Sequence, residues 1–213
     1  PQAMGYQGVA VVTDPDVFAL GDIGELLNRD LAGKAVWAVA RPGHNKRHDY
    51  IATSVMLLDC SKLTHWRFDE ELDSLFGHKF DYFSWIELKR QDPSTIGFLE
   101  PEWNDFDRLT PRTKLLHTTK RRTQPWKTGL PIDFTLHRIW PVNLLNKLLL
   151  RYLPHPDPNQ EAFVYSLLAE MVDSGEVSEA ELREEMAANH IRHDSLALID
   201  RHRGWNPRLA LAA

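Results

Sequence analysis

The sequence predicts an α/β protein, with a sheet followed by a C-terminal α-helical appendage. Two observations predict this class. Up to about residue 138, short apolar runs typical of buried strands alternate with helical patterns and with turns that contain Gly and Pro. From Ile139 onward, apolar residues recur at helical spacing instead. We therefore expect one domain over residues 1–138 and a helical appendage over residues 139–213.

Composition limits the classes of function. A chain of 213 residues that is 43% hydrophobic can bury one sizeable core, or one core with an appendage. Its net charge of −5 and pI near 6.1 give no general attraction to nucleic acid, so no nucleic-acid partner is expected. The single cysteine, Cys60, excludes an internal disulfide and fits a reducing, cytoplasmic location. No apolar run reaches the roughly 18 residues of a transmembrane segment.

The first strand is expected over Val9–Val12 and ends at two carboxylates, Asp14 and Asp16. Pro15 between them has a fixed φ and no backbone donor, which is typical of a strand end. Alternation along an extended chain would direct both carboxylates to the same side. Such a pair suits a hard divalent cation such as Mn²⁺ or Mg²⁺. The alternative is an Asp-Pro turn with two solvated acids.

The next elements follow from periodicity and turn residues. A short helix is expected over 21–29, a buried strand over 34–39, and a further strand over 50–59. The polar, cationic segment 44–49 is either a solvated connection or a substrate-facing flap.

Further along, a helix is expected over 69–76, ended by Gly77. An aromatic segment follows over 80–86, and a strand over 114–116 leads into His117 and a run of basic residues.

The appendage is expected to hold a helix from Trp140 to about Leu153, a second over 159–172, a third that begins near Ser178, and a short fourth over 190–202. Its size and pattern are typical of a packed subdomain. Contact of its first helix with a membrane surface, a peripheral attachment, is the alternative.

The stretch from Val9 to Ile23 resembles the metal-binding segment of GT-A glycosyltransferases, and more narrowly of glycosyltransferase family 8. There an apolar strand, Asp-x-Asp, an apolar pair and Gly-Asp-Ile recur together, and here they read Val9–Val12, Asp14-Pro15-Asp16, Val17-Phe18 and Gly21-Asp22-Ile23. The resemblance implies a partial GT-A (Rossmann-like) mixed sheet, with Asp14 and Asp16 as metal ligands.

Two later segments resemble the same family. Val55-Met56-Leu57-Leu58-Asp59 matches a strand that runs beside the donor sugar in the family, although Ala52 and Ser54 replace its Asn and Gly. Trp103-Asn104 and His117…Pro125-Trp126 match its last motifs. The resemblance implies that His117 completes the metal shell.

The family's diphosphate-binding Lys has no direct match, because the spacing after His117 is one residue longer and Thr123 or Gln124 stands in its place. Four cations surround the Pro-Trp pair and would meet the diphosphate instead: Lys120, Arg121, Arg122 and Lys127. In the aromatic segment, only Asp81 matches the family's Asp-Gln-Asp, with Tyr82 at the Gln position. Asp81 is therefore the catalytic candidate, and a capping Asp in an aromatic core segment is the alternative.

Together these motifs imply a divalent-metal-dependent glycosyltransferase that moves a sugar, with retention, from a UDP-linked or similar nucleotide-diphosphate sugar to a glycan, lipid or protein acceptor. In the family, Asp-x-Asp follows several βα units, whereas one strand precedes it here. We therefore expect the C-terminal part of a longer protein, poorly active alone. A metal-dependent phosphohydrolase and a degenerate GT-A remnant that serves as a non-catalytic interaction module remain alternatives.

Overall fold

The structure is a computed structural model that describes residues 1–43 and 49–211. Its packing forms two compact units, each described here by itself. The first comprises Pro1–Arg108 and Arg112–His117, and the second comprises Leu109–Pro111 and Thr118–Ala213. The flap or connection expected around residues 44–48 lies outside the described residues. The expected domain boundary at residue 138 stays a prediction.

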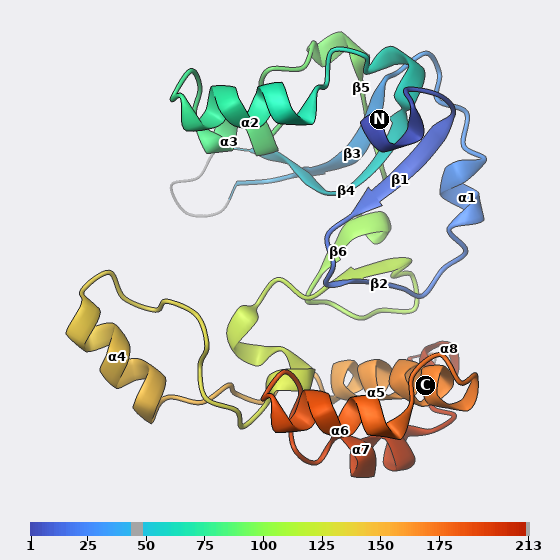
Figure 1. Ribbon diagram of the computed structural model, residues 1–213. Coiled ribbons are helices and arrows are strands. Elements are labelled where there is room, and N and C mark those ends of the chain that lie inside the picture. Colours follow the sequence, from blue (N-terminus) through green and yellow to red (C-terminus); the bar gives the residue numbers. More distant parts are fainter. Residues whose placement is uncertain (44–48, 212–213) are drawn as a thin grey trace. The chain divides into compact units, whose positions relative to one another are not determined.

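The first unit contains two mixed sheets (Figure 1). The four-stranded sheet has the order β1-β4-β3-β5, formed by Val9–Thr13, Tyr50–Asp59, Val36–Arg41 and Ile96–Phe98. Its β4 pairs antiparallel with β1 and β3, whereas β5 pairs parallel with β3. The three-stranded sheet has the order β2-β7-β6, formed by Val17–Ala19, Leu115–His117 and Asp105–Phe106. The predicted α/β class with a mixed sheet is confirmed.

The pairing of β4 with β3 is irregular, whereas its pairing with β1 is regular. Along β3, the β4 partner changes from Met56 opposite Ala38 to Ala52 opposite Val39, so part of β4 has no partner in β3. Along β1, the register runs without a break to Thr13 opposite Val55. Asp14 continues this pairing, because its backbone N–H donates a hydrogen bond to the carbonyl of Ser54 (2.9 Å).

Short helices connect the strands. The helix expected over 21–29 is only α1, Gly24–Leu27, whereas α2, Phe68–Phe76, ends before Gly77 as predicted. The aromatic segment forms α3, Tyr82–Ile86, and is not core, because Tyr82 and Phe83 are both more than half exposed. The 3₁₀ turns of this unit are η1 Gln2–Met4, η2 Cys60–Lys62, η3 Pro93–Thr95 and η4 Pro101–Asn104.

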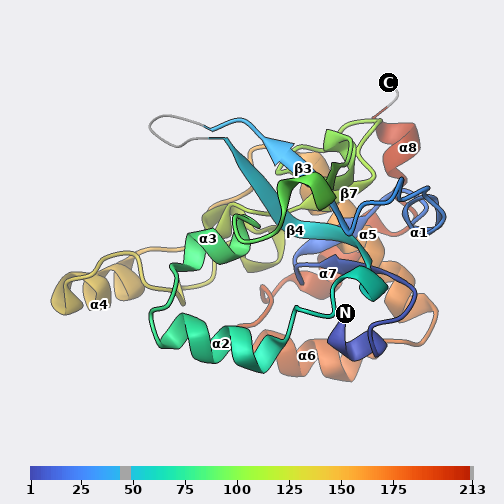
Figure 2. The same ribbon diagram turned by 90° about the horizontal axis from the view of Figure 1, so that it is seen from above.

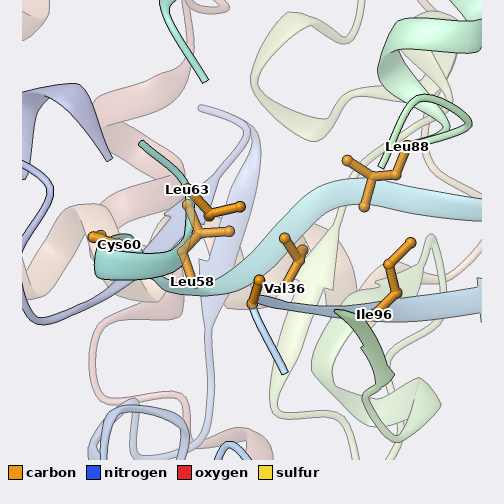
Figure 3. Packing of buried hydrophobic residues seen from close by; sticks show 7 residues of the cluster. Val36, Leu58, Cys60, Leu63, Leu88 and Ile96 are labelled. Carbon is orange, nitrogen blue, oxygen red and sulfur yellow. The ribbon is translucent and has the colours of Figure 1, made fainter. Parts of the chain in front are cut away.

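The core of the first unit lies against the four-stranded sheet. Figure 3 shows one cluster, in which Val36, Leu58 and Ile96 from three adjacent strands meet Leu63 and Leu88. A second cluster contains Leu26, Val39, Val55, Leu99, Trp103 and Leu115. Burial of these side chains holds β3 and β4 side by side, as Figure 2 shows from above.

The second unit is helical. It contains η5 Arg121–Thr123, η6 Pro125–Lys127, α4 Trp140–Leu149, α5 Pro158–Asp173, α6 Glu179–Ala187, α7 Ser195–His202 and α8 Pro207–Ala210. Tyr165 and Ala169 of α5 pack with Leu182 of α6 and Leu198 of α7. The predicted start of α6 is confirmed by a capping box between Ser178 and Glu181. Over the described part of the chain, no helix combines the length and apolar character of a membrane span.

Candidate metal centre

Asp14 and Asp16 lie in the turn that joins the two sheets of the first unit. The strand β1 ends at Thr13, and the N–H of Val17 donates to the carbonyl of Asp14 (3.2 Å) as β2 begins. Pro15 occupies the second position of this turn, where its fixed φ is favourable. The acids are thus brought together by a turn, and not by alternation along a continuous strand as the sequence suggested.

His117 lies beside the two aspartates, although it follows them by many residues in the chain. It is the last residue of β7 and lies opposite Val17 in antiparallel register and opposite Phe106 in parallel register. Its ring is almost fully buried and packs edge-on against the Phe106 ring, with 5.0 Å between centroids. The register with Val17 therefore places the imidazole beside the residue that precedes Val17, which is Asp16.

The three side chains form one cluster. The Nε2 atom of His117 lies 3.2 Å from Asp16 Oδ1 and 3.9 Å from Asp14 Oδ2. One ligand atom from each of the three residues lies within 4.8 Å of the other two. The side chains of His117, Asp16 and Asp14 are 9%, 29% and 55% exposed. The cluster therefore opens to solvent on the side of Asp14.

The donors fit a divalent cation. Two carboxylates and one imidazole are a ligand set that suits Mn²⁺, and the open side leaves room for further oxygen ligands. Nδ1 of His117 is buried and makes no hydrogen bond, so packing against Phe106, and not a hydrogen bond at Nδ1, sets the direction of Nε2. The same geometry serves as an ion pair when the imidazole is protonated, and the two arrangements differ in their response to added metal.

A buried polar network around Asn104 connects the backbone that holds Asp14 with the Phe106 ring that packs against His117. Asn104, fully buried, donates from Nδ2 to the hydroxyl of Ser54 (2.9 Å), the residue whose carbonyl holds Asp14. The carbonyl of Asn104 accepts a hydrogen bond from Arg41, whose guanidinium lies 4.1 Å from the centre of the Phe106 ring. Sequence reasoning assigned no role to Asn104, although the Trp103-Asn104 match was the signal for it.

A cavity of about 490 Å³ in the first unit includes Asp14 in its lining. Its wall combines apolar and aromatic side chains, among them Met56, Trp66 and Trp85, with the polar groups of Thr53 and Arg90. Such a mixture of apolar walls and few polar groups is typical of small-molecule sites. The cluster and the cavity therefore share a wall.

Asp81 has a local structural role. Its Oδ1 accepts a hydrogen bond from the backbone N–H of Ser84 (2.9 Å), and its Oδ2 accepts one from the Ser84 hydroxyl, so Asp81 caps α3. These bonds from Ser84 lower the pKa of the Asp81 carboxyl. The residue belongs neither to the carboxylate–imidazole cluster nor to the cavity lining. The capping alternative is thus present, and the catalytic role stays a prediction.

The four predicted diphosphate-binding cations all belong to the second unit, and their surroundings differ. Lys120, Arg121 and Arg122 are exposed. The Nζ atom of Lys127 lies 2.8 Å from Asp133 Oδ2 and donates to the carbonyl of Asn189, with only 14% of the side chain exposed. Most of the charge of Lys127 is therefore met within its own unit.

Comparison with known proteins found a partial similarity in backbone structure to two solved structures. No family model matches the sequence, and no curated protein matches it. The glycosyltransferase GlyE of Streptococcus pneumoniae TIGR4 aligns with a TM-score of 0.45 and 18% identity, over 67% of this chain and 40% of that one. The galactosyltransferase LgtC, in complex with donor and acceptor sugar analogs, aligns with a TM-score of 0.42 and 12% identity, over 71% of this chain and 65% of that one. The chain spans less than two thirds of the length of either protein.

Proposed function

We propose that this chain is the metal-binding part of a glycosyltransferase that uses a nucleotide-diphosphate sugar, with UDP as the nucleotide. One observation carries the proposal: Asp14, Asp16 and His117, which the motif resemblance names as ligands, have donor atoms within 4.8 Å of one another. Asp14 and His117 are about a hundred positions apart in the chain, so this meeting does not follow from local structure.

In this proposal Asp14, Asp16 and His117 hold Mn²⁺ or Mg²⁺. When bound, the cation neutralises charge on the diphosphate leaving group. Packing against Phe106 fixes the direction of the His117 imidazole. The side of the cluster next to the exposed Asp14 stays open for the nucleotide-sugar donor. Lys120, Arg121, Arg122 and Lys127 add positive charge for the diphosphate, and the three exposed ones carry most of this role.

The cavity beside Asp14 is proposed to receive the sugar. Its indole walls, Trp66 and Trp85, offer flat apolar surfaces to the C–H faces of a sugar ring, and the Thr53 hydroxyl offers a polar group. Thr53 lies in the strand that the resemblance places beside the donor sugar. Because Asp81 is engaged as the cap of α3, we propose retention without a nucleophile from the protein. The acceptor hydroxyl would attack the anomeric carbon on the face that the diphosphate leaves, the bond from that carbon to the diphosphate oxygen would break, and the leaving diphosphate would take the hydroxyl proton.

Metal titration tests the proposal. The chain should bind Mn²⁺ in a calorimetric titration, and UDP should bind only when Mn²⁺ is present. Asp16→Asn should weaken Mn²⁺ binding by more than about 100-fold, because even partners outside the ligand shell are worth about 10- to 100-fold. Asp69→Asn, an exposed acid in the first turn of α2, is the matched control and should bind as the parent does.

The outcomes separate the alternatives. Absence of Mn²⁺ and Mg²⁺ binding by a folded chain would remove the metal-dependent mechanism and favour the interaction module. Metal-dependent release of phosphate from simple esters, without UDP binding, would favour the phosphohydrolase.

A further inference from the structure

The helix α4 exposes its apolar residues and turns its polar residues inward. Within it, Trp140 and Leu149 are 74% and 68% exposed, and its other exposed apolar side chains are Val142, Leu144, Leu145 and Leu148. Its polar residues, Asn143, Asn146 and Lys147, are each partly buried. The Oδ1 atom of Asn143 accepts a hydrogen bond from the backbone N–H of Leu136 (2.9 Å), which fixes the polar side toward the preceding segment. The usual arrangement of a surface helix is reversed.

The apolar surface is unusually broad. At about 100° per residue, the positions from Trp140 to Leu149 that carry apolar side chains cover an arc of roughly 200°. Ile139, directly before the helix, and Leu153, shortly after it, are also about half exposed. A helix that docks in a protein groove normally uses a stripe of roughly 100°, so this arc exceeds what one groove covers. Exposed apolar surface of this extent marks an interaction site.

The charge around α4 is opposite to that of the chain. No Asp or Glu lies between Asp133 and Asp157, whereas Arg138, Lys147 and Arg151 do, in a protein of net charge −5. Arg138 and Arg151 are exposed and lie before and after the helix. A broad apolar arc bordered by cations, with Trp at one end, is the pattern of helices that lie in the interface of a bilayer.

We propose that α4 is a docking surface for a membrane that contains anionic lipid, with its axis in the plane of the interface. The apolar arc enters the boundary between headgroups and acyl chains, and the exposed Arg138 and Arg151 face anionic headgroups. Charge favours a bilayer as the occupant, because a protein groove for this helix would need to match both an apolar arc of roughly 200° and the two exposed cations that border it. This inference is independent of the proposed glycosyltransferase function.

The chain contains its own control. In α2, Phe68 and Phe76 are 57% and 76% exposed, so this helix also presents large apolar side chains to solvent. Its first turn, however, contains Asp69, Glu70 and Glu71. Because anionic headgroups repel those carboxylates, α2 should not bind the same surface.

Co-sedimentation with vesicles tests the proposal. The 213-residue chain should bind vesicles of phosphatidylcholine with phosphatidylglycerol, and bind phosphatidylcholine alone much more weakly. Leu145→Glu with Leu148→Glu places two carboxylates in the centre of the apolar arc and should abolish binding. Arg138→Gln with Arg151→Gln should lower the partition onto anionic vesicles by about tenfold or more, because each cation near the surface contributes about 1 kcal/mol. Phe68→Ser with Phe76→Ser should leave it unchanged.

Circular dichroism and thermal unfolding should be the same for all these variants, because the replaced side chains are exposed. Binding that persists in the Leu145→Glu, Leu148→Glu variant would overturn the proposal. So would a lack of vesicle binding together with self-association in sedimentation velocity that this variant loses, because the face would then belong to a second copy of the chain.

Discussion

His117 combines two roles that the two aspartates do not share, because its ring is both a ligand candidate and a packed side chain. Its Nε2 faces Asp16 at 3.2 Å, and its ring contacts Phe106. Asp14 is exposed, so its replacement should affect ion binding alone. His117 therefore allows packing and ligation to be separated by the choice of substitution.

We predict that His117→Phe and His117→Ala both lose Mn²⁺ binding but differ in stability. Phe keeps the edge-on contact with Phe106 and removes the unpaired Nδ1, whereas Ala leaves a cavity worth about 2–4 kcal/mol. Urea unfolding and Mn²⁺ titration measure the two effects. Retention of tight Mn²⁺ binding by His117→Phe would show that the imidazole is not a ligand.

Substitutions of the cations after His117 also allow ligand binding to be separated from stability. Arg121→Ala with Arg122→Ala should weaken UDP binding and leave thermal stability unchanged, because both side chains are exposed. Each contact with phosphate that is lost should be worth about 1.5–3 kcal/mol. Lys127→Ala should instead lower stability, since Asp133 loses its ion-pair partner. Unchanged UDP affinity in the double variant would make Arg121 and Arg122 ordinary surface residues.

Among the strands, β5 depends on a close approach to β3. Gly97 lies opposite Trp37 in parallel register, and a Cβ at position 97 would lie 2.4 Å from the indole ring. The ring cannot easily move, because Trp37 Nε1 donates to the carbonyl of Leu31 (3.2 Å).

We therefore expect Gly97→Ala to destabilise the first unit by about 1–3 kcal/mol in urea unfolding. Adding Trp37→Leu should recover part of this loss, because the smaller side chain leaves room for the new methyl group. A Gly97→Ala variant as stable as the parent would mean that β5 can shift away from β3.

In the second unit, Asp133 joins the segment before α4 to the residues after it. It accepts hydrogen bonds from Lys127 Nζ (2.8 Å) and from the hydroxyl of Tyr152 (2.5 Å). Burial alone would raise the pKa of the Asp133 carboxyl, but these two donors outweigh it and the pKa lies below its ordinary value of 3.8. The pKa of Tyr152 is raised, by burial and by the same carboxylate.

This shift predicts a pH dependence. Because the folded-state pKa of Asp133 is lowered, its contribution to stability is present above the unfolded pKa of 3.8 and is lost as pH falls through the folded value. Asp133→Asn should therefore lower the melting temperature near neutral pH, and the difference from the parent should shrink as the pH falls below 3.8 and through the folded-state pKa. A difference that stays constant while the Asp133 carboxyl becomes protonated would assign the effect to packing and not to charge.

For the molecule as a whole, the motifs cover one part of the machinery that a nucleotide-sugar transferase needs. The described residues supply a candidate ion site and a cavity beside it.

On the proposed function, we predict that the 213-residue chain releases UDP from a UDP-sugar only when a divalent cation is present, because the cation would neutralise charge on the leaving diphosphate. A release assay with Mn²⁺ and with EDTA, each with and without candidate glycan acceptors, measures this. Release that continues unchanged in EDTA would remove the cation from the proposed mechanism.

Local sequence patterns predicted much of the architecture. The apolar run from Tyr50 to Asp59 is β4 with the same bounds, Gly77 follows the end of α2, and the Ser178–Glu181 pair starts α6. These features depend on near neighbours in the chain, through alternation, helix caps and turns, and such signals can be recognised in a single sequence.

The candidate site was predicted in part. The Asp14-Pro15-Asp16 pattern identified two ligand candidates, and the family resemblance implied the third, His117. Asn104 was missed because its contact with Ser54 joins positions fifty residues apart. The pairing of Lys127 with Asp133 was missed because the sequence near Pro-Trp looks the same whether or not a carboxylate forms an ion pair with the lysine.

The sequence by itself therefore determined the longer strands and helices, several of their end signals and the residue types of the candidate ion site, whereas the short strands β2, β5 and β6 were not predicted. Tertiary packing decided which of these groups meet: the register of Val17 with His117 brings the imidazole to Asp16, and the orientation of α4 leaves its apolar arc exposed. The physical reason is that such contacts join positions far apart in the chain. Their closure is stabilised by the summed burial of core residues such as Leu115 and Trp103, and not by any local preference of the residues that meet.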